Sequence, residues 1–316
     1  MAAELRSTFE GRTMVLTISN PEHRNALGPE MYAAGVEALN VAESNADVHC
    51  VVLTGEGEAF CAGGNLQRLQ ANRQKPPEVQ AQSIENLHSW IEAIRTFPKP
   101  VIAAVEGPAA GAGFSLALAC DLIVAARNAV FVMAYSSVAL SPDGGGSWSL
   151  AHALPRQLVN ELLMGGERMG AQRLHELGVV NRLCDAGQAL GTALDWAEKL
   201  GARAPNVLTS IKELVSEAPA HSLNAHLAME RDHFVTNLHH ANGGIGIAAE
   251  SDCLQHAVQH LAVVDADHIL PARNAELFHD VGHHHAHLGI GGDARRAHRV
   301  GVELHELAEA ARTRLL

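Results

Sequence analysis

The 316-residue sequence has few aromatic side chains, few cysteines and no excess of positive charge. Aromatics make up 4% of the chain, so its core must be built from Leu, Val, Ile and Ala. The net charge of −12 argues against a nucleic-acid partner, because phosphate binding needs a basic surface. The five cysteines are odd in number and contain no Cys-x-x-Cys pair, which indicates a reducing compartment and not a disulfide framework.

Long apolar runs free of charge are also absent. Residues 1–16 lack a basic segment followed by an apolar core, so no signal peptide is expected. The most apolar stretch, residues 101–125, is interrupted by Glu106, Pro108 and Asp121, whereas a membrane span needs about 20 predominantly apolar residues. We therefore expect a soluble, cytoplasmic protein with no membrane partner.

Strands alternate with helices along most of the chain. Runs rich in β-formers predict strands at residues 13–18, 50–54, 101–105, 122–125, 130–133 and 179–183. Helical patterns cover residues 29–43, 83–96, 114–119, 147–164, 170–177 and 186–240, and the polar segment 67–82 is expected to be a mobile loop. This alternation indicates an α/β fold followed by an all-helical segment.

Two glycine-rich turns follow predicted strands. One, at residues 107–113, leads from a strand into a helix, and the other is Ala-Phe-Cys-Ala-Gly-Gly-Asn-Leu at residues 59–66. The first N–H groups of a helix are unpaired, and the helix dipole adds partial positive charge there. Such a turn can bind an anion, or a carbonyl oxygen that becomes one during a reaction. Many strand–turn–helix units share this pattern, so the turns alone are a weak signal.

The last 67 residues, 250–316, have a different composition. They contain ten of the twenty histidines, no lysine and one aromatic, Phe278. The histidines between His279 and His287 have a spacing that can bind a metal, but no carboxylate or cysteine framework orders them. We expect no metal site, and interpret the segment as a compositional tail.

Six motifs occur in a fixed order. They are Asn-Pro-Glu-His-Arg-Asn-Ala-Leu (20–27), Phe-Cys-Ala-Gly-Gly-Asn-Leu (60–66), Lys-Pro-Val-Ile-Ala-Ala-Val-Glu-Gly (99–107), Ala-Gly-Ala-Gly-Phe-Ser-Leu-Ala-Leu-Ala-Cys-Asp (110–121), Ser-Pro-Asp-Gly-Gly-Gly (141–146) and Gly-Glu-Arg-Met-Gly-Ala-Gln-Arg-Leu-His-Glu-Leu-Gly-Val-Val (166–180). In this order they resemble the crotonase superfamily, also called the enoyl-CoA hydratase/isomerase family. The resemblance covers residues 10–249.

The resemblance implies an α/β fold made of a spiral of ββα units, with a C-terminal helical segment that forms trimers. On this basis residues 1–200 are the crotonase spiral core, residues 201–249 the C-terminal helical segment, and residues 250–316 an atypical His-rich tail. The family motif Gly-Ile-x-Ala is present at residues 246–249, but the chain then departs from the family. We expect that a shifted reading frame replaced the native terminus.

The resemblance also implies the binding residues for an acyl-CoA partner. Two backbone N–H groups of the family hold the thioester oxygen, and these fall on Gly64 and Ala112. The positions that correspond to the CoA and pantetheine contacts are Arg24, Ala26, Ala62, Gly64 and Leu66. Arg24 has a second interpretation as a solvated surface charge. No metal or nucleotide cofactor is implied, since CoA arrives as part of the substrate, and a homotrimer or hexamer is expected.

The chemistry is expected to depend on Asp143. An ungapped count places the two hydratase glutamates on Ser115 and Tyr135, and hydration needs two carboxyl groups to deliver water. Asp143 lies in a Pro-Asp pair like that of the phenylacetate-pathway isomerases, which convert an epoxide-CoA to an oxepin-CoA. A single carboxylate there can move a proton between the α- and γ-carbons of an enoyl thioester. We predict double-bond isomerisation, with Asp143 and Tyr135 as candidate catalytic residues.

Other interpretations stay open. The chlorobenzoyl-CoA dehalogenases have a nucleophilic aspartate at the place of Asp143 and a water-activating histidine at the place of His88, although their tryptophan is Tyr135 here. Hydration by another route, or acyl-CoA binding without catalysis, would also fit. Asp143 can serve as a helix cap or turn residue. Ser115, with Asp143 and His152 downstream, loosely resembles a nucleophile elbow.

Overall fold

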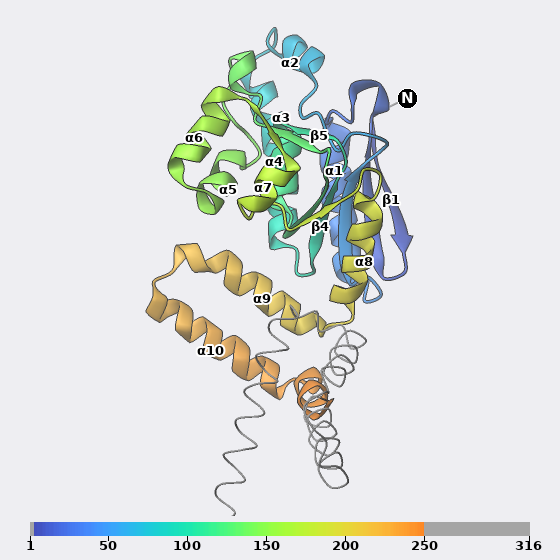
Figure 1. Ribbon diagram of the computed structural model, residues 1–316, viewed down its shortest axis with the longest axis vertical. Coiled ribbons are helices and arrows are strands. Elements are labelled where there is room, and N and C mark those ends of the chain that lie inside the picture. Colours follow the sequence, from blue (N-terminus) through green and yellow to red (C-terminus); the bar gives the residue numbers. More distant parts are fainter. Residues whose placement is uncertain (1–2, 250–316) are drawn as a thin grey trace, which may run out of the picture. The chain divides into compact units, whose positions relative to one another are not determined.

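The computed structural model of the protein describes residues 3–249, and this part contains two sheets (Figure 1). The larger sheet has the strand order β1-β2-β3-β4-β6-β9, with β1 antiparallel to β2 and the other neighbours parallel. Its strands are β1 (Glu4–Glu10), β2 (Thr13–Ser19), β3 (Cys50–Gly55), β4 (Val101–Val105), β6 (Leu122–Ala126) and β9 (Arg182–Cys184). The smaller sheet is formed by β5 (Pro108–Ala110), β7 (Val130–Val132) and β8 (Arg168–Gly170).

Helices follow most of the strands. They are α1 (Pro29–Ser44), α2 (Leu66–Asn72), α3 (Pro77–Thr96), α4 (Ala112–Ala119), α5 (Gly146–Ala153), α6 (Arg156–Gly165), α7 (Ala171–Glu176), α8 (Ala189–Gly201), α9 (Pro205–Glu217) and α10 (Leu223–His239). Short 3-10 turns are η1 (Pro21–His23), η2 (Ser136–Val138) and η3 (Ala218–Ala220). Residues 1–242 form one compact unit; a second begins at residue 243, and its described residues, 243–249, are helical.

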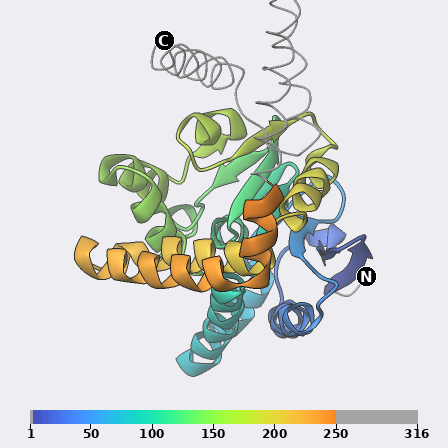
Figure 2. The same ribbon diagram turned by 90° about the horizontal axis from the view of Figure 1, so that it is seen from below.

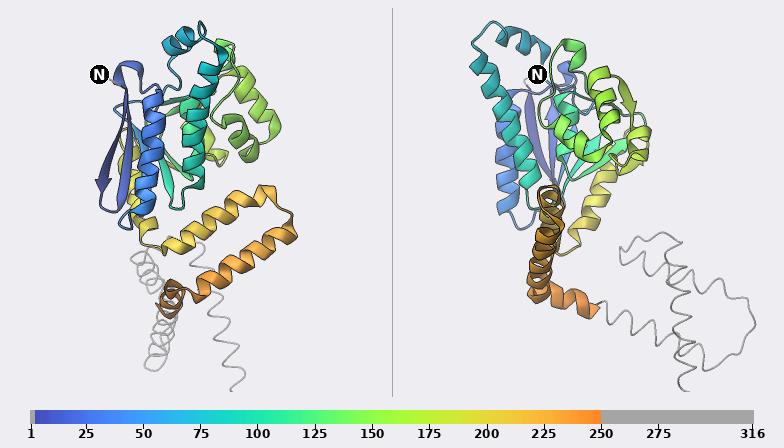
Figure 3. Two further views of the ribbon diagram at one scale, coloured as in Figure 1. Left: turned by 180° about the vertical axis from the view of Figure 1, so that it is seen from behind. Right: turned by 90° about the vertical axis from the view of Figure 1, so that its left-hand side faces the viewer.

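The parallel strands are buried on both faces. Because successive side chains of a strand point to opposite faces, Val51 and Leu53 of β3 join the core beneath α1 and α3, whereas Cys50 and Val52 join a second core beneath α8. Small residues at Ala189, Ala193 and Ala197 let α8 lie close to the sheet. Figure 3 shows α1 and α3 on one face of the sheet and α8 on the other.

Helices α1 and α3 approach each other closely at one glycine. A Cβ atom at Gly35 would lie 2.2 Å from the indole ring of Trp90, which is fully buried. No larger residue fits there unless the indole ring moves. The contact fixes the spacing of the two helices that cover this face of the sheet.

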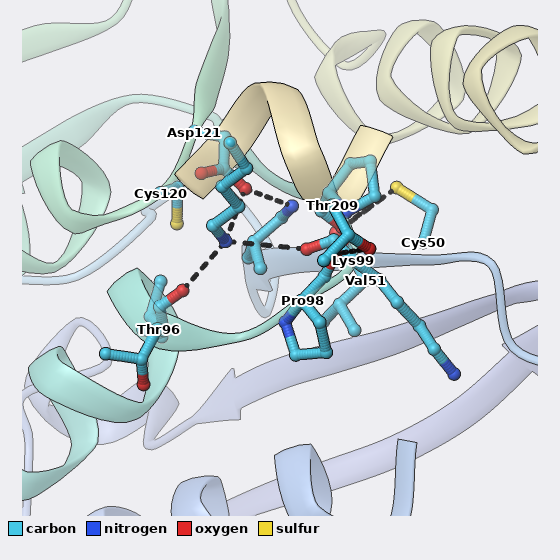
Figure 4. Close-up of polar contacts among 12 residues, drawn as sticks. Cys50, Val51, Thr96, Pro98, Lys99, Cys120, Asp121 and Thr209 are labelled. Atoms are coloured by element: carbon cyan, nitrogen blue, oxygen red, sulfur yellow. Dashed lines mark hydrogen bonds and ion pairs between the residues drawn. The ribbon is translucent and has the colours of Figure 1, made fainter. Parts of the chain in front are cut away.

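Helix α9 is tied to the sheet by polar contacts (Figure 4). Lys212 Nζ lies 2.8 Å from Asp121 Oδ2, and the same carboxylate oxygen accepts the Val101 N–H. Thr209 Oγ1 donates to the carbonyl oxygen of Pro98 at 2.8 Å. The aspartate of the Cys-Asp pair at 120–121 therefore joins the core strands to the C-terminal helices. Helix α10 packs against α9 as an antiparallel hairpin (Figure 2).

The structure corrects several sequence-based expectations. The expected mobile loop at residues 67–82 is wrong: α2 and the first turns of α3 occupy it, because Asn65 caps α2 and Pro77 is favourable at the first position of α3. The single helix expected at residues 147–164 is two helices, since Pro155 cannot continue α5. Strands β1, β5 and β8 were not anticipated.

Among residues 3–249, no helix is long and apolar enough to cross a membrane.

Candidate active site

Two glycine turns meet at the amino-terminal end of α4. Gly63 has a φ of +86°, and a Cβ atom there would lie 2.5 Å from the Ala110 carbonyl oxygen and 3.3 Å from the Ala112 nitrogen. A Cβ at Gly113 would lie 2.4 Å from the Cys61 carbonyl oxygen. Only glycine permits these approaches. The two motifs that are 50 residues apart in the sequence are thus held in backbone contact.

The two residues whose N–H groups are expected to bind an oxygen, Gly64 and Ala112, lie in the two turns that meet. Helix α4 begins at Ala112, and within residues 3–249 neither the Gly64 N–H nor the Ala112 N–H donates to a protein acceptor. The N–H groups just before Gly64 are occupied: Ala62 N–H donates to Arg24 O, and Gly63 N–H to Cys61 Sγ. The dipole of α4 adds partial positive charge beside its first N–H groups. In the described part of the chain, both N–H groups are therefore without a protein acceptor.

Cys61 lies in the first of these turns and is fully buried. Burial raises the pKa of its thiol to about 12, against the opposing hydrogen bond from Gly63. The side chain therefore stays a neutral thiol at physiological pH. It packs and accepts a hydrogen bond, and it is not a nucleophile.

Asp143 is held by Tyr135. Tyr135 Oη donates to Asp143 Oδ1 at 2.6 Å, a short distance typical of a bond to a carboxylate. Burial and the neighbouring negative charge of Asp143 raise the pKa of the Tyr135 hydroxyl, so the phenol remains protonated and acts as the donor. The Asp143 side chain is half-buried, between Pro142 and a run of glycines.

The Tyr135–Asp143 pair lies beside the free donors. A Cβ at Gly111, the residue before Ala112, would be 3.6 Å from the Tyr135 ring carbon that carries the hydroxyl. Ser115, one turn into α4, donates its hydroxyl to the Asp143 carbonyl at 3.0 Å. Helix α4 thus presents its first N–H group and fixes the loop that carries Asp143.

Ser115 holds the Asp143 loop through its hydroxyl and is not placed to act as a nucleophile. Its side chain is buried, and a Cβ at Gly146 would lie 2.5 Å from its Oγ. His152 is directed elsewhere, since its Nδ1 contacts the Trp148 carbonyl oxygen at 2.8 Å. It lines a cavity of about 290 Å³ at the carboxyl-terminal end of α4, together with Asp121. The structure does not bring a Ser–His pair together.

His88 is half-buried on α3. The flanking Leu87 packs within 3.5 Å of the Cβ position of Gly144, so this face of α3 covers the loop next to Asp143. Among the residues described, the His88 side chain makes no hydrogen bond or ion pair. The structure places it near the Asp143 loop but does not connect it to the carboxylate.

The first loop lies against the glycine turn. Leu27 N–H donates to Gly63 O at 2.7 Å, and the Asn25 side chain donates to the Glu56 and Ala59 carbonyl oxygens. The loop positions expected to contact CoA differ in exposure: Arg24 is exposed and Ala26 is buried. On the glycine turn, Ala62 is half-buried, and Gly64 and Leu66 are exposed. The two segments pair through Ala62, whose N–H donates to Arg24 O at 3.0 Å, and through a bridge between Leu27 and Gly64. Among residues 3–249, no group of side chains could hold a metal ion; the histidine cluster of the tail lies outside this range.

Tyr32 and Arg68 were missed by the sequence analysis. Tyr32 is buried on α1, and burial raises the pKa of its hydroxyl, against the nearby Arg68 guanidinium, which lowers it. The negative charge of Asp143 also raises the pKa of the Tyr32 hydroxyl, and a hydrogen bond with the Arg68 side chain lowers it. The two side chains come from helices separated by a strand and a turn. No local pattern could have paired them.

Comparison with known proteins agrees with this geometry. The family model for enoyl-CoA hydratase/isomerase matches residues 8–251. The chain is 36% identical over 228 residues to a 1,2-epoxyphenylacetyl-CoA isomerase of Escherichia coli, covering 72% of this chain and 87% of that protein. It is 30% identical over 232 residues to a 2,3-dehydroadipyl-CoA hydratase of the same organism, covering 73% and 89%.

Solved structures share the fold. The crystal structure of an enoyl-CoA hydratase from Polaromonas sp. JS666 has a TM-score of 0.78 and 70% sequence identity, and the match covers 79% of this chain and 97% of that chain. The two sheets and the paired glycine turns define a crotonase-type acyl-CoA enzyme. The chain belongs to the enoyl-CoA hydratase/isomerase family.

Proposed function

We propose that this enzyme moves the double bond of an enoyl-CoA, with Asp143 as the acid/base. One observation carries the proposal: Tyr135, at the second hydratase position, holds the Asp143 carboxylate beside the Ala112 N–H, while the first hydratase position is Ser115. Ser115 and Tyr135 replace both carboxylates that hydration by the usual route needs. Isomerisation needs one carboxylate and no water.

The proposed reaction starts with the thioester oxygen between the Gly64 and Ala112 N–H groups. Removal of a proton from C2 of a 3-enoyl-CoA by Asp143 leaves negative charge on that oxygen, where the two donors and the α4 dipole stabilise it. Asp143 then returns the proton to C4, which gives the 2-enoyl-CoA. The neutral Tyr135 phenol keeps Asp143 in place during both steps.

The CoA part is proposed to lie along the first loop and the glycine turn. Arg24 is exposed and fits a phosphate contact, and the backbone at Ala26, Ala62, Gly64 and Leu66 fits the pantetheine. No metal or redox group is needed for a proton transfer within one substrate. The isomerase name of the Escherichia coli relative supports this choice, although hydratase names also occur among the relatives.

The helical hairpin is proposed to mediate assembly into a trimer or hexamer. Val215 of α9 and Leu223 and Phe234 of α10 are 69%, 75% and 70% exposed, which is unusual for large apolar side chains on one hairpin. A cytoplasmic location remains our expectation from the sequence.

The test is to incubate 3-enoyl-CoA with the wild type and with Asp143→Asn, and to identify the products by proton NMR. The proposal expects 2-enoyl-CoA from the wild type, and a fall in kcat of about 100-fold or more in the variant. Asp143→Asn keeps the size of the side chain and its place beside Tyr135. Direct formation of 3-hydroxyacyl-CoA without prior isomerisation would mean that the enzyme is a hydratase. Acyl-CoA binding without any turnover would mean a binding protein.

A further inference from the structure

Asn25 of the first loop is fully buried, with 0% of its surface exposed, and its side chain makes three hydrogen bonds. Its Nδ2 donates to the carbonyl oxygens of Glu56 at 2.9 Å and Ala59 at 2.7 Å, and its Oδ1 accepts the Asn20 N–H at 3.0 Å. These bonds fix the segments that they join, because the loss of any of them would leave a buried polar group unpaired. Asn25 therefore ties the first loop to residues 56–59, which lead into the glycine turn.

The backbone of Asn25 is left-handed, with a φ of +60°, and that of the preceding Arg24 is left-handed as well, at +50°. Asparagine tolerates this conformation better than most residues do. Before the bend, Arg24 O accepts the Ala62 N–H at 3.0 Å. After it, Leu27 N–H donates to Gly63 O at 2.7 Å. The first loop and the glycine turn are thus paired on both sides of Asn25.

The hydrogen bond from Leu27 to Gly63 also sets the direction of the Gly64 N–H. The Gly63 carbonyl and the Gly64 N–H belong to one planar trans peptide group, so they point in opposite directions. Because the first loop holds the carbonyl, the N–H points away from that loop, and within residues 3–249 no protein acceptor takes it. The direction of this donor therefore depends on where the first loop lies.

The other proposed donor, the Ala112 N–H, is fixed in a different way. The Gly111 carbonyl, which belongs to the same peptide group, accepts the Ser115 N–H at 3.0 Å in the first turn of α4. Helix α4 itself therefore holds this donor. A change at Asn25 is expected to move the Gly64 donor and to leave the Ala112 donor in place.

We propose that Asn25 is a positioning residue, which holds the first loop so that the Gly64 N–H points at the thioester oxygen of an acyl-CoA. This inference rests on the site proposed above for that oxygen. Asn25 is fully buried, so it acts through the bond from Leu27 to Gly63 and not by touching the substrate. A hydrogen bond weakens steeply as its angle departs from linear, so a rotation of one peptide group is enough to weaken the contact.

The experiment measures hydrogen bonding at the thioester oxygen directly. Butanoyl-CoA labelled with ¹³C at the thioester carbon is bound to the full-length protein at saturation, and isotope-edited infrared difference spectra give the carbonyl stretching frequency. The wild type is expected to lower this frequency relative to the free thioester in water. Asn25→Gly keeps the left-handed backbone and removes the three side-chain bonds. It is expected to lose about half of the downshift, because one of the two donors is misdirected.

Asn25→Asp is the second variant, and it is expected to lose the same part of the downshift. It keeps the size of the side chain but turns a carboxylate oxygen toward the Glu56 and Ala59 carbonyl oxygens. In both variants, kcat for the enoyl-CoA reaction of the wild type should fall about 10- to 100-fold, with KM changed less than about threefold. Thr209→Val is the matched control: it removes a 2.8 Å hydrogen bond from α9 to the Pro98 carbonyl, and should keep the downshift and kcat.

A full downshift in either Asn25 variant would overturn the inference. Failure of both variants to fold would also overturn it, because Asn25 would then serve folding and not the donor, and so would an equal loss in Thr209→Val. An Asn25-dependent downshift in an enzyme that fails to isomerise 3-enoyl-CoA would refute the proposed reaction and leave the role of Asn25 standing. Isomerisation with a full downshift in the variants would do the reverse. A wild type that gives no downshift, or does not bind butanoyl-CoA, would contradict both.

Discussion

Tyr135 donates its hydroxyl hydrogen to Asp143 at 2.6 Å, and this contact spans the η2 turn and the loop before α5. The hydrogen bond, together with the bond from Ser115 to the Asp143 backbone, keeps the carboxylate facing the start of α4. Ser115 and Tyr135, which the sequence analysis expects at the positions of the two hydratase glutamates, thus both hold the residue Asp143.

Replacing Tyr135 with phenylalanine removes the hydroxyl and keeps the ring. We expect kcat to fall about 10-fold, since one hydrogen bond to a charged group is lost, with KM nearly unchanged. Steady-state kinetics on 3-enoyl-CoA measure both constants, and a melting curve controls for folding. A change in KM alone would show that Tyr135 contacts substrate and does not position Asp143.

The Ala112 N–H can be removed without breaking α4. Proline is tolerated at the first position of a helix, where the N–H has no partner in the helix. Ala112→Pro should therefore lower kcat about 100- to 1,000-fold, as the loss of one oxyanion donor does. Ala112→Ser, which keeps the N–H, is the matched control. If the two variants are equally active, the Ala112 N–H does not stabilise the negative charge on the thioester oxygen.

The two tyrosines of the chain, Tyr32 and Tyr135, both have pKa values raised above the usual 10.0, mainly by burial. The folded state therefore holds these protons more tightly than the unfolded state. This contribution to stability is fully present below pH 10, and is lost as the pH rises above it, where the unfolded chain releases protons.

A spectrophotometric titration checks this prediction. Phenolate absorbance should appear only at the pH where circular dichroism shows unfolding, and the free energy of unfolding should fall with pH above 10.0. A phenolate signal with its midpoint near 10.0 in the folded protein would show that at least one hydroxyl is solvated.

The exposed apolar side chains of the hairpin predict an oligomer. Light scattering after size-exclusion chromatography should give a trimer or hexamer for the wild type and a smaller species for Phe234→Glu, because a buried glutamate in the interface is costly. Met164→Glu is the matched control, since Met164 of α6 is 73% exposed. A monomeric wild type at all concentrations would contradict the assembly.

The glycine turns of the site could be predicted from the sequence, whereas the contact between Tyr32 and Arg68 could not. Gly63 and Gly113 stand in the two glycine-rich turns that the sequence analysis identified, and Ala112 follows from the start of a helix. Tyr32 of α1 and Arg68 of α2 come near each other only in the folded chain, which no local pattern encodes. Their contact depends on the tertiary fold.

Two parts of the fold also differ from what their sequence pattern predicts. Strand β1 has no buried side chain and one half-buried side chain, Leu5, so it lacks an alternating pattern and forms by pairing with β2. The polar composition of residues 67–82 favoured a loop, yet the cap at Asn65 and the proline at Pro77 begin two helices. In this segment, the residues that favour a helix start predict the structure better than the polar composition does.

The most direct test of the account follows one hydrogen atom. A 3-enoyl-CoA deuterated at C2 is converted in ordinary water, and mass spectrometry and NMR measure the deuterium at C4 of the 2-enoyl-CoA. If Asp143 alone removes and returns the proton, part of the label must appear at C4 in single-turnover experiments, before exchange with solvent. Complete replacement by solvent hydrogen at the earliest times would contradict a single acid/base at Asp143.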